Sequence, residues 1–219
     1  MRAYWIFEDV NLFKLLCPHK YKAHRKKHDS CNFEKHDFIY MQHDHSRQIY
    51  LIEKGKVKIG YYDAQGNEIT KAILGKGEIF GERALLATDH REEFAQSIDS
   101  CSICAMGTET MHELMRNNRD FTLRIYKFLN FRFKKLERRL KVLLHKDTKT
   151  RLKEFISDLC EEGYDCPDTG DRVIQHSYTQ QDMASLIGTS RPTLSTLMNE
   201  LQQEGYLRFS RKQIRVLAA

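Results

Sequence analysis

The sequence lacks a long apolar segment. Its 219 residues contain no run of about eighteen apolar side chains, the length that a membrane-spanning helix requires. The N-terminus carries Glu8 and Asp9, where a secretory signal would be apolar. We therefore expect a cytoplasmic protein with no membrane partner, in which the six cysteines are reduced.

The sequence also lacks a strong excess of one charge. Its 36 basic and 30 acidic residues give a net charge of +6, so we expect a surface of mixed charge. A moderate positive excess is typical of proteins that bind nucleic acid through a local footprint rather than a basic tail. The length allows one or two domains with an ample core.

A pattern typical of catalysis is missing as well. The sequence shows no nucleophile–base pair. The carboxylates that could form a cluster are Glu82, Glu92 and Glu93. These acidic residues are better explained as part of an altered ligand loop, described below. The sequence therefore indicates that the protein is not an enzyme.

Residues 179–199 have the spacing of a helix-turn-helix. Ala184 precedes Gly188 by four residues, so a small side chain lies where a second helix would cross the first. Gly188 tolerates the positive φ that the turn requires. Ser190 can cap the second helix, and Pro192 is tolerated in its first turn because the amides there have no helical partner.

The second helix has one apolar face and one polar face. Leu194, Leu197, Met198 and Leu201 recur at helical spacing, and an arginine with short polar side chains lies opposite, as suits a major groove. The first helix of the pair is predicted over about 179–187. The alternative to a DNA-binding motif is an ordinary hairpin of two helices. The predicted DNA contacts, including two in the hairpin described next, are Thr179, Gln180, Thr189, Ser190, Arg191, Thr193, Ser195, Thr196, Asn199, Arg211 and Lys212.

A basic hairpin follows the second helix. Gly205 ends that helix, and the sequence then predicts two short strands over about 206–209 and 213–217. Arg211 and Lys212 lie at the tip between these strands, where they can contact phosphates beside the groove. This hairpin is a predicted wing, although a solvated edge strand would have a similar sequence.

The first half of the chain has the pattern of a β-barrel or jelly roll. From Phe33 to Met106, short apolar segments alternate with turns at Gly55, Gly66, Gly75 and Gly77. The predicted strands read F-I-Y, I-Y-L-I-E, K-V-K-I-G-Y-Y, E-I-T-K-A-I-L and C-S-I-C-A-M.

From about Asn118 the periodicity becomes helical. One apolar stripe, formed by Phe121, Ile125 and Phe128, can face the barrel. A second stripe steps by three and four residues, as in a coiled coil, and predicts a two-fold dimer, although packing on the barrel alone is the alternative. The predicted dimer residues are Tyr126, Leu129, Phe133, Leu136, Leu140 and Leu143, and a further helix over 148–162 is expected to open the DNA-binding domain.

These segments resemble the Crp/Fnr family of bacterial transcription regulators. The resemblance rests on F-E-K-H-D-F-I-Y, I-Y-L-I-E-K-G-K-V-K-I, I-F-G-E-R-A-L-L and D-M-A-S-L-I-G-T-S-R-P-T-L-S, and it covers the chain after about Asn11. It implies an α+β protein with a jelly-roll effector domain (1–118), a dimerisation helix (119–146) and a winged helix-turn-helix domain (147–219). It also implies a homodimer that binds a palindromic double-stranded DNA operator, with RNA polymerase and a small-molecule effector as partners.

The resemblance leaves the effector and any cofactor unknown. In cyclic-nucleotide-binding members the motif F-G-E is followed by an arginine and a small hydroxyl residue, but here Glu92 and Glu93 follow Arg91. Carboxylates there would repel a phosphate, and the base-binding hydroxyls of the dimer helix are replaced, so we expect no response to cyclic AMP. The candidate effector-pocket residues are Gly81, Glu82, Arg91, Glu92, Leu136 and Glu137.

A redox or gas-sensing site is the competing interpretation. Members of the family with an iron–sulfur cluster use four cysteines, whereas here Cys104 is accompanied only by Cys17 and Cys31 in the preceding region. Six histidines lie between residues 19 and 45, among them His19, but two of them stand in the charge run K-Y-K-A-H-R-K-K-H-D, and histidines scattered among lysine and arginine are typical of a solvated loop. We expect no metal site and keep Cys17, His19, Cys31 and Cys104 as weak candidates.

Overall fold

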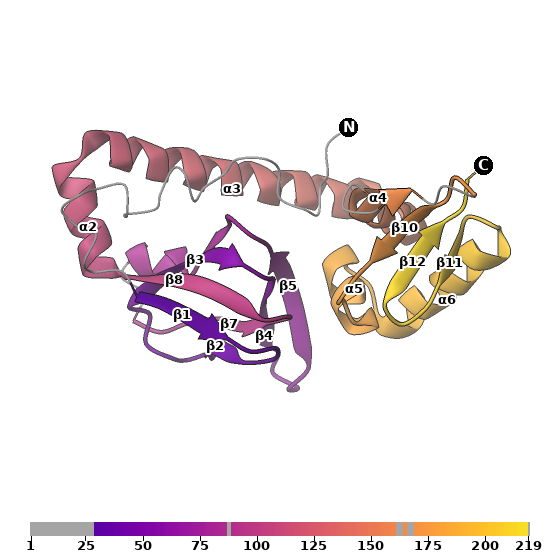
Figure 1. Ribbon diagram of the computed structural model, residues 1–219, viewed down its shortest axis with the longest axis horizontal. Coiled ribbons are helices and arrows are strands. Elements are labelled where there is room, and N and C mark those ends of the chain that lie inside the picture. Colours follow the sequence, from indigo (N-terminus) through magenta and orange to yellow (C-terminus); the bar gives the residue numbers. More distant parts are fainter. Residues whose placement is uncertain (1–28, 87–88, 161–163, 166–168, 219) are drawn as a thin grey trace. The chain divides into compact units, whose positions relative to one another are not determined.

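The computed structural model describes residues 29–86, 89–160, 164–165 and 169–218. These residues form two compact units that divide within helix α3 (Arg119–His145), between Lys134 and Lys135. Figure 1 labels the elements of each unit. None of the helices in the described part of the chain is both long enough and apolar enough to span a membrane.

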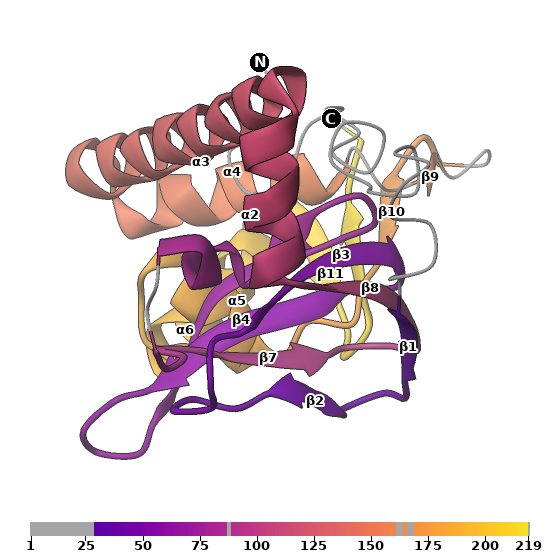
Figure 2. The same ribbon diagram turned by 90° about the vertical axis from the view of Figure 1, so that its left-hand side faces the viewer.

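The N-terminal unit is built on two four-stranded antiparallel sheets, as expected of a jelly roll (Figure 2). One sheet has the order β1-β8-β3-β6 and the other the order β2-β7-β4-β5. Five strands confirm the predicted segments, while β1, β6 and β7 were not predicted. The bounds are β1 (Asp29–Phe33), β2 (Phe38–Tyr40), β3 (Gln48–Lys54), β4 (Val57–Tyr62), β5 (Glu68–Leu74), β6 (Ile79–Phe80), β7 (Phe94–Ser97) and β8 (Cys101–Gly107).

Helices cover the outer face of the first sheet. Phe121, Ile125 and Phe128 of α3 are 0%, 3% and 4% exposed and share one apolar cluster with β3, β6 and β8, which confirms that this stripe faces the barrel. Helix α2 (Thr108–Asn117) and the short 3-10 helix η3 (Glu82–Leu86) complete the cluster. Helical structure therefore begins ten residues before the expected start at Asn118.

In its described residues, the C-terminal unit contains the end of α3, three further helices and a four-stranded antiparallel sheet. The helices are α4 (Thr148–Cys160), α5 (Gln180–Ile187) and α6 (Arg191–Gln203). The sheet has the order β11-β12-β10-β9, with bounds β9 (Tyr164–Asp165), β10 (Arg172–Gln175), β11 (Leu207–Phe209) and β12 (Gln213–Val216). The wing strands β11 and β12 were predicted, whereas β9 and β10 were not.

The turn between α5 and α6 has the predicted chemistry. Gly188 adopts φ +70° as the C-cap of α5, and the Ser190 hydroxyl accepts a hydrogen bond from the Thr193 amide at the start of α6. Pro192 lies in the first turn of α6, and Leu194, Met198 and Leu201 are buried, while Leu197 is half-buried. The helix-turn-helix prediction is thus confirmed as local structure.

Two arginines support the end of α5 from other helices. Arg139 of α3 donates to the Leu186 carbonyl at 3.0 Å. Arg151 of α4 donates to the carbonyls of Ile187 and Gly188 at 2.9 and 3.1 Å. Both arginines therefore satisfy backbone acceptors that the end of a helix leaves without intrahelical partners.

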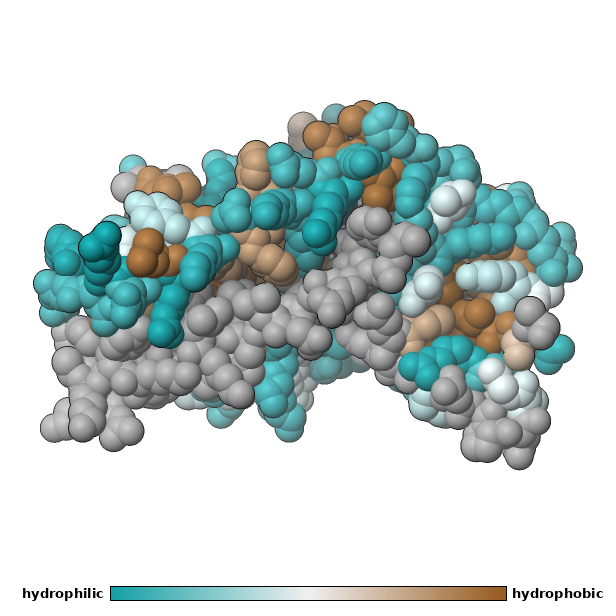
Figure 3. Space-filling model, turned by 90° about the horizontal axis from the view of Figure 1, so that it is seen from above, coloured by the Kyte–Doolittle hydropathy of each residue, from teal (hydrophilic) through white to brown (hydrophobic). Residues whose placement is uncertain are grey.

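Helix α3 carries an exposed apolar row. Tyr126, Phe133, Leu136 and Leu140 are 62%, 60%, 65% and 56% exposed, and Leu129 is 37% exposed. Figure 3 shows brown side chains interrupting the teal surface along this helix. Leu143 departs from the predicted row because it is half-buried and its Cδ2 lies against Gly188. Leu144, at 70% exposed, is the apolar residue of the last turn that faces solvent.

We predict that Gly188→Ala destabilises the protein more than Gly170→Ala does. Both glycines have φ +70°, so alanine at either position costs about 1–2 kcal/mol of backbone strain. At Gly188 the added Cβ would lie 2.7 Å from Leu143 Cδ2, whereas at Gly170 it would lie 3.6 Å from Ala218 Cβ. Urea unfolding followed by circular dichroism measures the difference, and equal losses would contradict the packing of Leu143 on the turn.

Candidate nucleic-acid interface and effector region

Helix α6 presents a polar surface on its exposed face. Arg191, Thr193, Thr196 and Asn199 are exposed, and Ser195 is half-buried. In the described part of the chain, the side chains of Arg191 and Asn199 make no hydrogen bond, so their donors are available to another molecule. An arginine and an asparagine on one helix face are suited to the edges of guanine and adenine in a major groove.

The remaining predicted DNA contacts flank this helix. Thr179 and Gln180 lie at the start of α5, where the Thr179 hydroxyl forms a capping box with Asp182. Thr189 is half-buried and Ser190 is exposed in the turn. Arg211 and Lys212 are both exposed between β11 and β12. All of these residues belong to the C-terminal unit, in which α6 lies between the turn and the wing.

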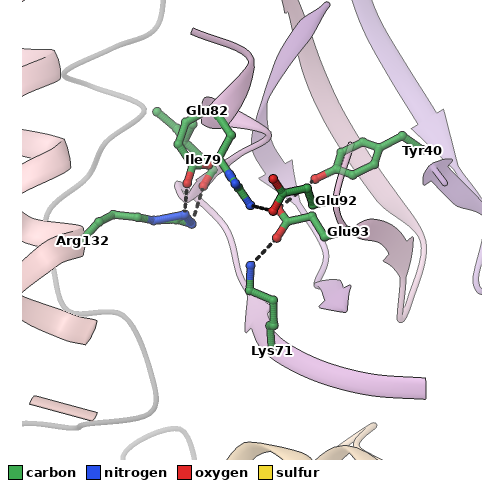
Figure 4. Close-up of polar contacts among 8 residues, drawn as sticks. Tyr40, Lys71, Ile79, Glu82, Glu92, Glu93 and Arg132 are labelled. Atoms are coloured by element: carbon green, nitrogen blue, oxygen red, sulfur yellow. Dashed lines mark hydrogen bonds and ion pairs between the residues drawn. The ribbon is translucent and has the colours of Figure 1, made fainter. Parts of the chain in front are cut away.

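In the N-terminal unit, Glu82 is held by an arginine of helix α3. Arg132 donates to the Glu82 carboxylate at 2.7 Å and to the Ile79 carbonyl at 3.2 Å (Figure 4). Sequence reasoning did not assign Arg132 to this site. It continues the buried stripe of Phe121, Ile125 and Phe128 at helical spacing, and this continuation is the signal that could have found it.

Arg91 lies inside the barrel rather than at its surface. The residue is 4% exposed, and its guanidinium donates to the carbonyls of Gly81 and Gln48 at 3.1 and 2.5 Å. The same group stacks over the Tyr40 ring, 4.4 Å from its centroid. Gly81 has φ +72°, and a Cβ there would lie 2.9 Å from the guanidinium, so a glycine permits this close approach.

Glu92 and Glu93 both have cationic partners, which corrects our expectation of uncompensated repulsion. Glu92 is exposed and pairs with Arg83 at 2.5 Å. Glu93 pairs with Lys71 and accepts a hydrogen bond from the Tyr40 hydroxyl (Figure 4). Burial, together with the Glu93 carboxylate, raises the pKa of Tyr40, which keeps this phenol protonated as a donor. Each carboxylate is therefore paired with a cation of its own chain.

An apolar cavity of about 20 Å³ lies close to Glu82. Its walls come from β3, β6, β8, η3, α2 and the first half of α3, and among the described residues Glu82 is the one charged residue that lines it. A volume of this size holds no more than about one water-sized group. The other two effector candidates, Leu136 and Glu137, are exposed residues of α3 beyond the division between the units.

The cysteines of the described region are not arranged as a metal site. Cys104 is 1% exposed within the apolar cluster, and Cys31 pairs in register with Ile103, so the two thiols point to opposite faces of the sheet. Burial raises the pKa of Cys101 to about 11. No group of three potential ligands occurs among the residues that the structure describes. Cys17 and His19 lie outside the described residues.

Two models of known protein families match the chain, one in each unit. The model of the cyclic nucleotide-binding domain matches residues 30–118, and that of the Crp-like helix-turn-helix domain matches residues 150–219. A jelly roll followed by a helix-turn-helix of this type defines a two-domain, DNA-binding transcription regulator.

Known proteins support the same assignment. The chain is 27% identical over 189 residues to the global nitrogen regulator of Nostoc sp., covering 84% of this chain and 83% of that protein. It is 28% identical over 182 residues to the cyclic AMP receptor protein of Thermus thermophilus, covering 83% and 80%. The structure of the c-di-GMP-responsive global regulator of Xanthomonas campestris has the same fold, with a TM-score of 0.77, 20% identity and coverage of 96% and 100%. The two domain models and these relatives together support a DNA-binding transcription regulator of the Crp/Fnr type.

Proposed function

We propose that this regulator acts in the cytoplasm as a homodimer that binds a palindromic operator, contacts RNA polymerase and responds to an effector other than a cyclic nucleotide. The observation that carries the proposal is the exposed face of α6, where Arg191 and Asn199 have available donors. Two copies of this face, related by a two-fold axis, would read two half-sites about one helical turn apart.

The roles of the two arginines in DNA binding should differ. Arg191 lies at the first turn of the recognition helix, whereas Arg211 lies at the wing tip beside Lys212. A group that contacts a base contributes to specificity, while a group that contacts a phosphate contributes to affinity for every sequence.

We predict that Arg191→Ala loses about 1–3 kcal/mol on the operator and relaxes one base position, while binding to random DNA changes little. Arg211→Ala should weaken binding to all sequences alike and reduce the dependence on salt. Gel shifts on the operator and on random duplexes at several salt concentrations measure both effects. Equal losses on the two kinds of DNA for Arg191→Ala would contradict the assignment.

The exposed row of α3 supports the proposed dimer. Tyr126, Leu129, Phe133, Leu136 and Leu140 follow coiled-coil spacing, and the stripe that faces the barrel uses other residues of the same helix. Pairing of two such rows would bury each of these side chains and contribute about 1.5–3 kcal/mol per residue.

We predict that the double substitution Phe133→Glu and Leu140→Glu gives a monomer that keeps its folded barrel and binds the operator poorly. Light scattering measures the mass, and circular dichroism tests the fold. The control is Lys134→Glu with Lys141→Glu, which places acidic side chains one residue further along the helix, at exposed positions outside the row. A wild-type monomer at micromolar concentration, or a dimeric double variant, would contradict the proposed interface.

The polar contacts of the N-terminal unit argue against a cyclic nucleotide as effector. By resemblance to the family, Glu82 and Arg91 stand where ribose and phosphate would be bound, but here both have intramolecular partners. A nucleotide would have to break the contacts of a buried arginine and of a carboxylate–guanidinium pair, and buried groups are costly to leave without partners.

We predict that calorimetry with cyclic AMP and with cyclic GMP gives no dissociation constant below about 10 μM, because these intramolecular contacts must be broken first. Operator affinity should be the same with and without either nucleotide. Tighter nucleotide binding, accompanied by tighter operator binding, would show that the loop opens and would overturn the prediction.

A further inference from the structure

The hydroxyl groups of Thr193 and Thr196 in helix α6 are directed toward the helix and its cap. The Thr196 hydroxyl donates to the Pro192 carbonyl at 3.2 Å. The Thr193 hydroxyl lies 2.8 Å from that of Ser190, which also accepts from the Thr193 amide at 3.2 Å. Between Arg191 and Asn199, the threonine hydroxyls are thus engaged within the helix and its cap.

This arrangement leaves apolar groups at the surface of that segment. When the Thr196 hydroxyl lies against the preceding turn, staggered geometry directs its methyl group away from the Pro192 carbonyl. Pro192 and Thr196 are both exposed, and Pro192 contributes a ring with no amide donor. Pro192 and Thr196 therefore place apolar groups within the exposed face of α6, between the hydrogen-bonding groups of Arg191 and Asn199.

We propose that Thr196, beside Pro192, recognises thymine in the operator through its 5-methyl group. This inference rests on the proposed DNA-binding function and names the chemistry by which α6 reads one base. Among the four bases only thymine presents a methyl group in the major groove, and a threonine methyl is an apolar partner suited to it. Thr196 is five residues after Arg191, about 7.5 Å along the helix, so the two side chains would contact different base pairs.

The competing arrangement is a hydrogen bond from Thr196 to a base. In that case the hydroxyl leaves the Pro192 carbonyl and turns toward the DNA, where threonine can contact several bases. The two arrangements use different atoms of one side chain. Thr196→Val keeps the methyl group and the shape and replaces the hydroxyl with a second methyl, whereas Thr196→Ser keeps the hydroxyl and removes the methyl.

The experiment begins with selection of an operator from random duplex DNA by the full-length protein. Each thymine of the half-site is then replaced by deoxyuridine, which lacks only the methyl group. At one position we expect wild-type affinity to fall about fourfold, the effect of one buried methyl group. Thr196→Ser should show the same loss on the thymine operator and no further loss on the deoxyuridine operator. Thr196→Val should match the wild type on each operator, with the same affinity for the thymine operator and the same lower affinity for the deoxyuridine operator.

The controls separate this inference from the function on which it rests. Affinity for random duplex DNA should be unchanged in both variants, and circular dichroism should show that they are folded. If an operator is selected but no deoxyuridine lowers affinity, or if Thr196→Val is the weaker variant, methyl recognition is wrong and DNA binding stands. If no sequence is enriched at all, the proposed operator-binding function is wrong, and this inference with it.

Discussion

The orientation of the recognition helix depends on hydrogen bonds to the end of helix α5. Three successive carbonyls, those of Leu186, Ile187 and Gly188, accept from Arg139 and Arg151, which come from α3 and α4. Burial lowers the pKa of Arg139, but a guanidinium remains charged in proteins, so these are charge-assisted hydrogen bonds. The end of α3 and the start of α4 are thereby fixed to the turn from which α6 begins.

A similar use of arginine organises the N-terminal unit. Arg91 binds backbone carbonyls inside the barrel, and Arg132 links α3 to Glu82 and to the Ile79 carbonyl. These contacts engage the groups that resemblance to the family would assign to a ligand. The apolar cavity beside Glu82 is lined in part by Ile125 and Phe128 of α3, the helix that also carries the exposed row.

Sequence reasoning was most successful where structure depends on neighbouring residues. Gly188, Ser190 and Pro192 indicated the turn and its caps correctly because each acts within a few residues of its own position. It missed the short strands, whose few residues show no clear period, and it missed helix α2, although Met111, Leu114 and Met115 recur there at helical spacing.

Contacts between distant residues were the main source of error in the candidate site. Lys71, which pairs with Glu93, is 22 residues away, and nothing in the local sequence identifies it as the partner of that carboxylate. Donors to backbone carbonyls, such as Arg139 and Arg151, leave no pattern at all because every residue offers the same acceptor. The expectation that Glu92 and Glu93 are uncompensated was wrong because Arg83 and Lys71 pair with these carboxylates.

The position of Leu143 limits how far two α3 helices could stay together. By heptad spacing it would follow Leu140 in a coiled coil, but it packs on Gly188 of its own chain instead. In a dimer of the proposed kind, the paired region would end at Leu140, and each helix beyond that residue would belong to its own DNA-binding domain. Leu143 would then mark the point at which the two helices separate. The position of that point would set the distance between the two DNA half-sites.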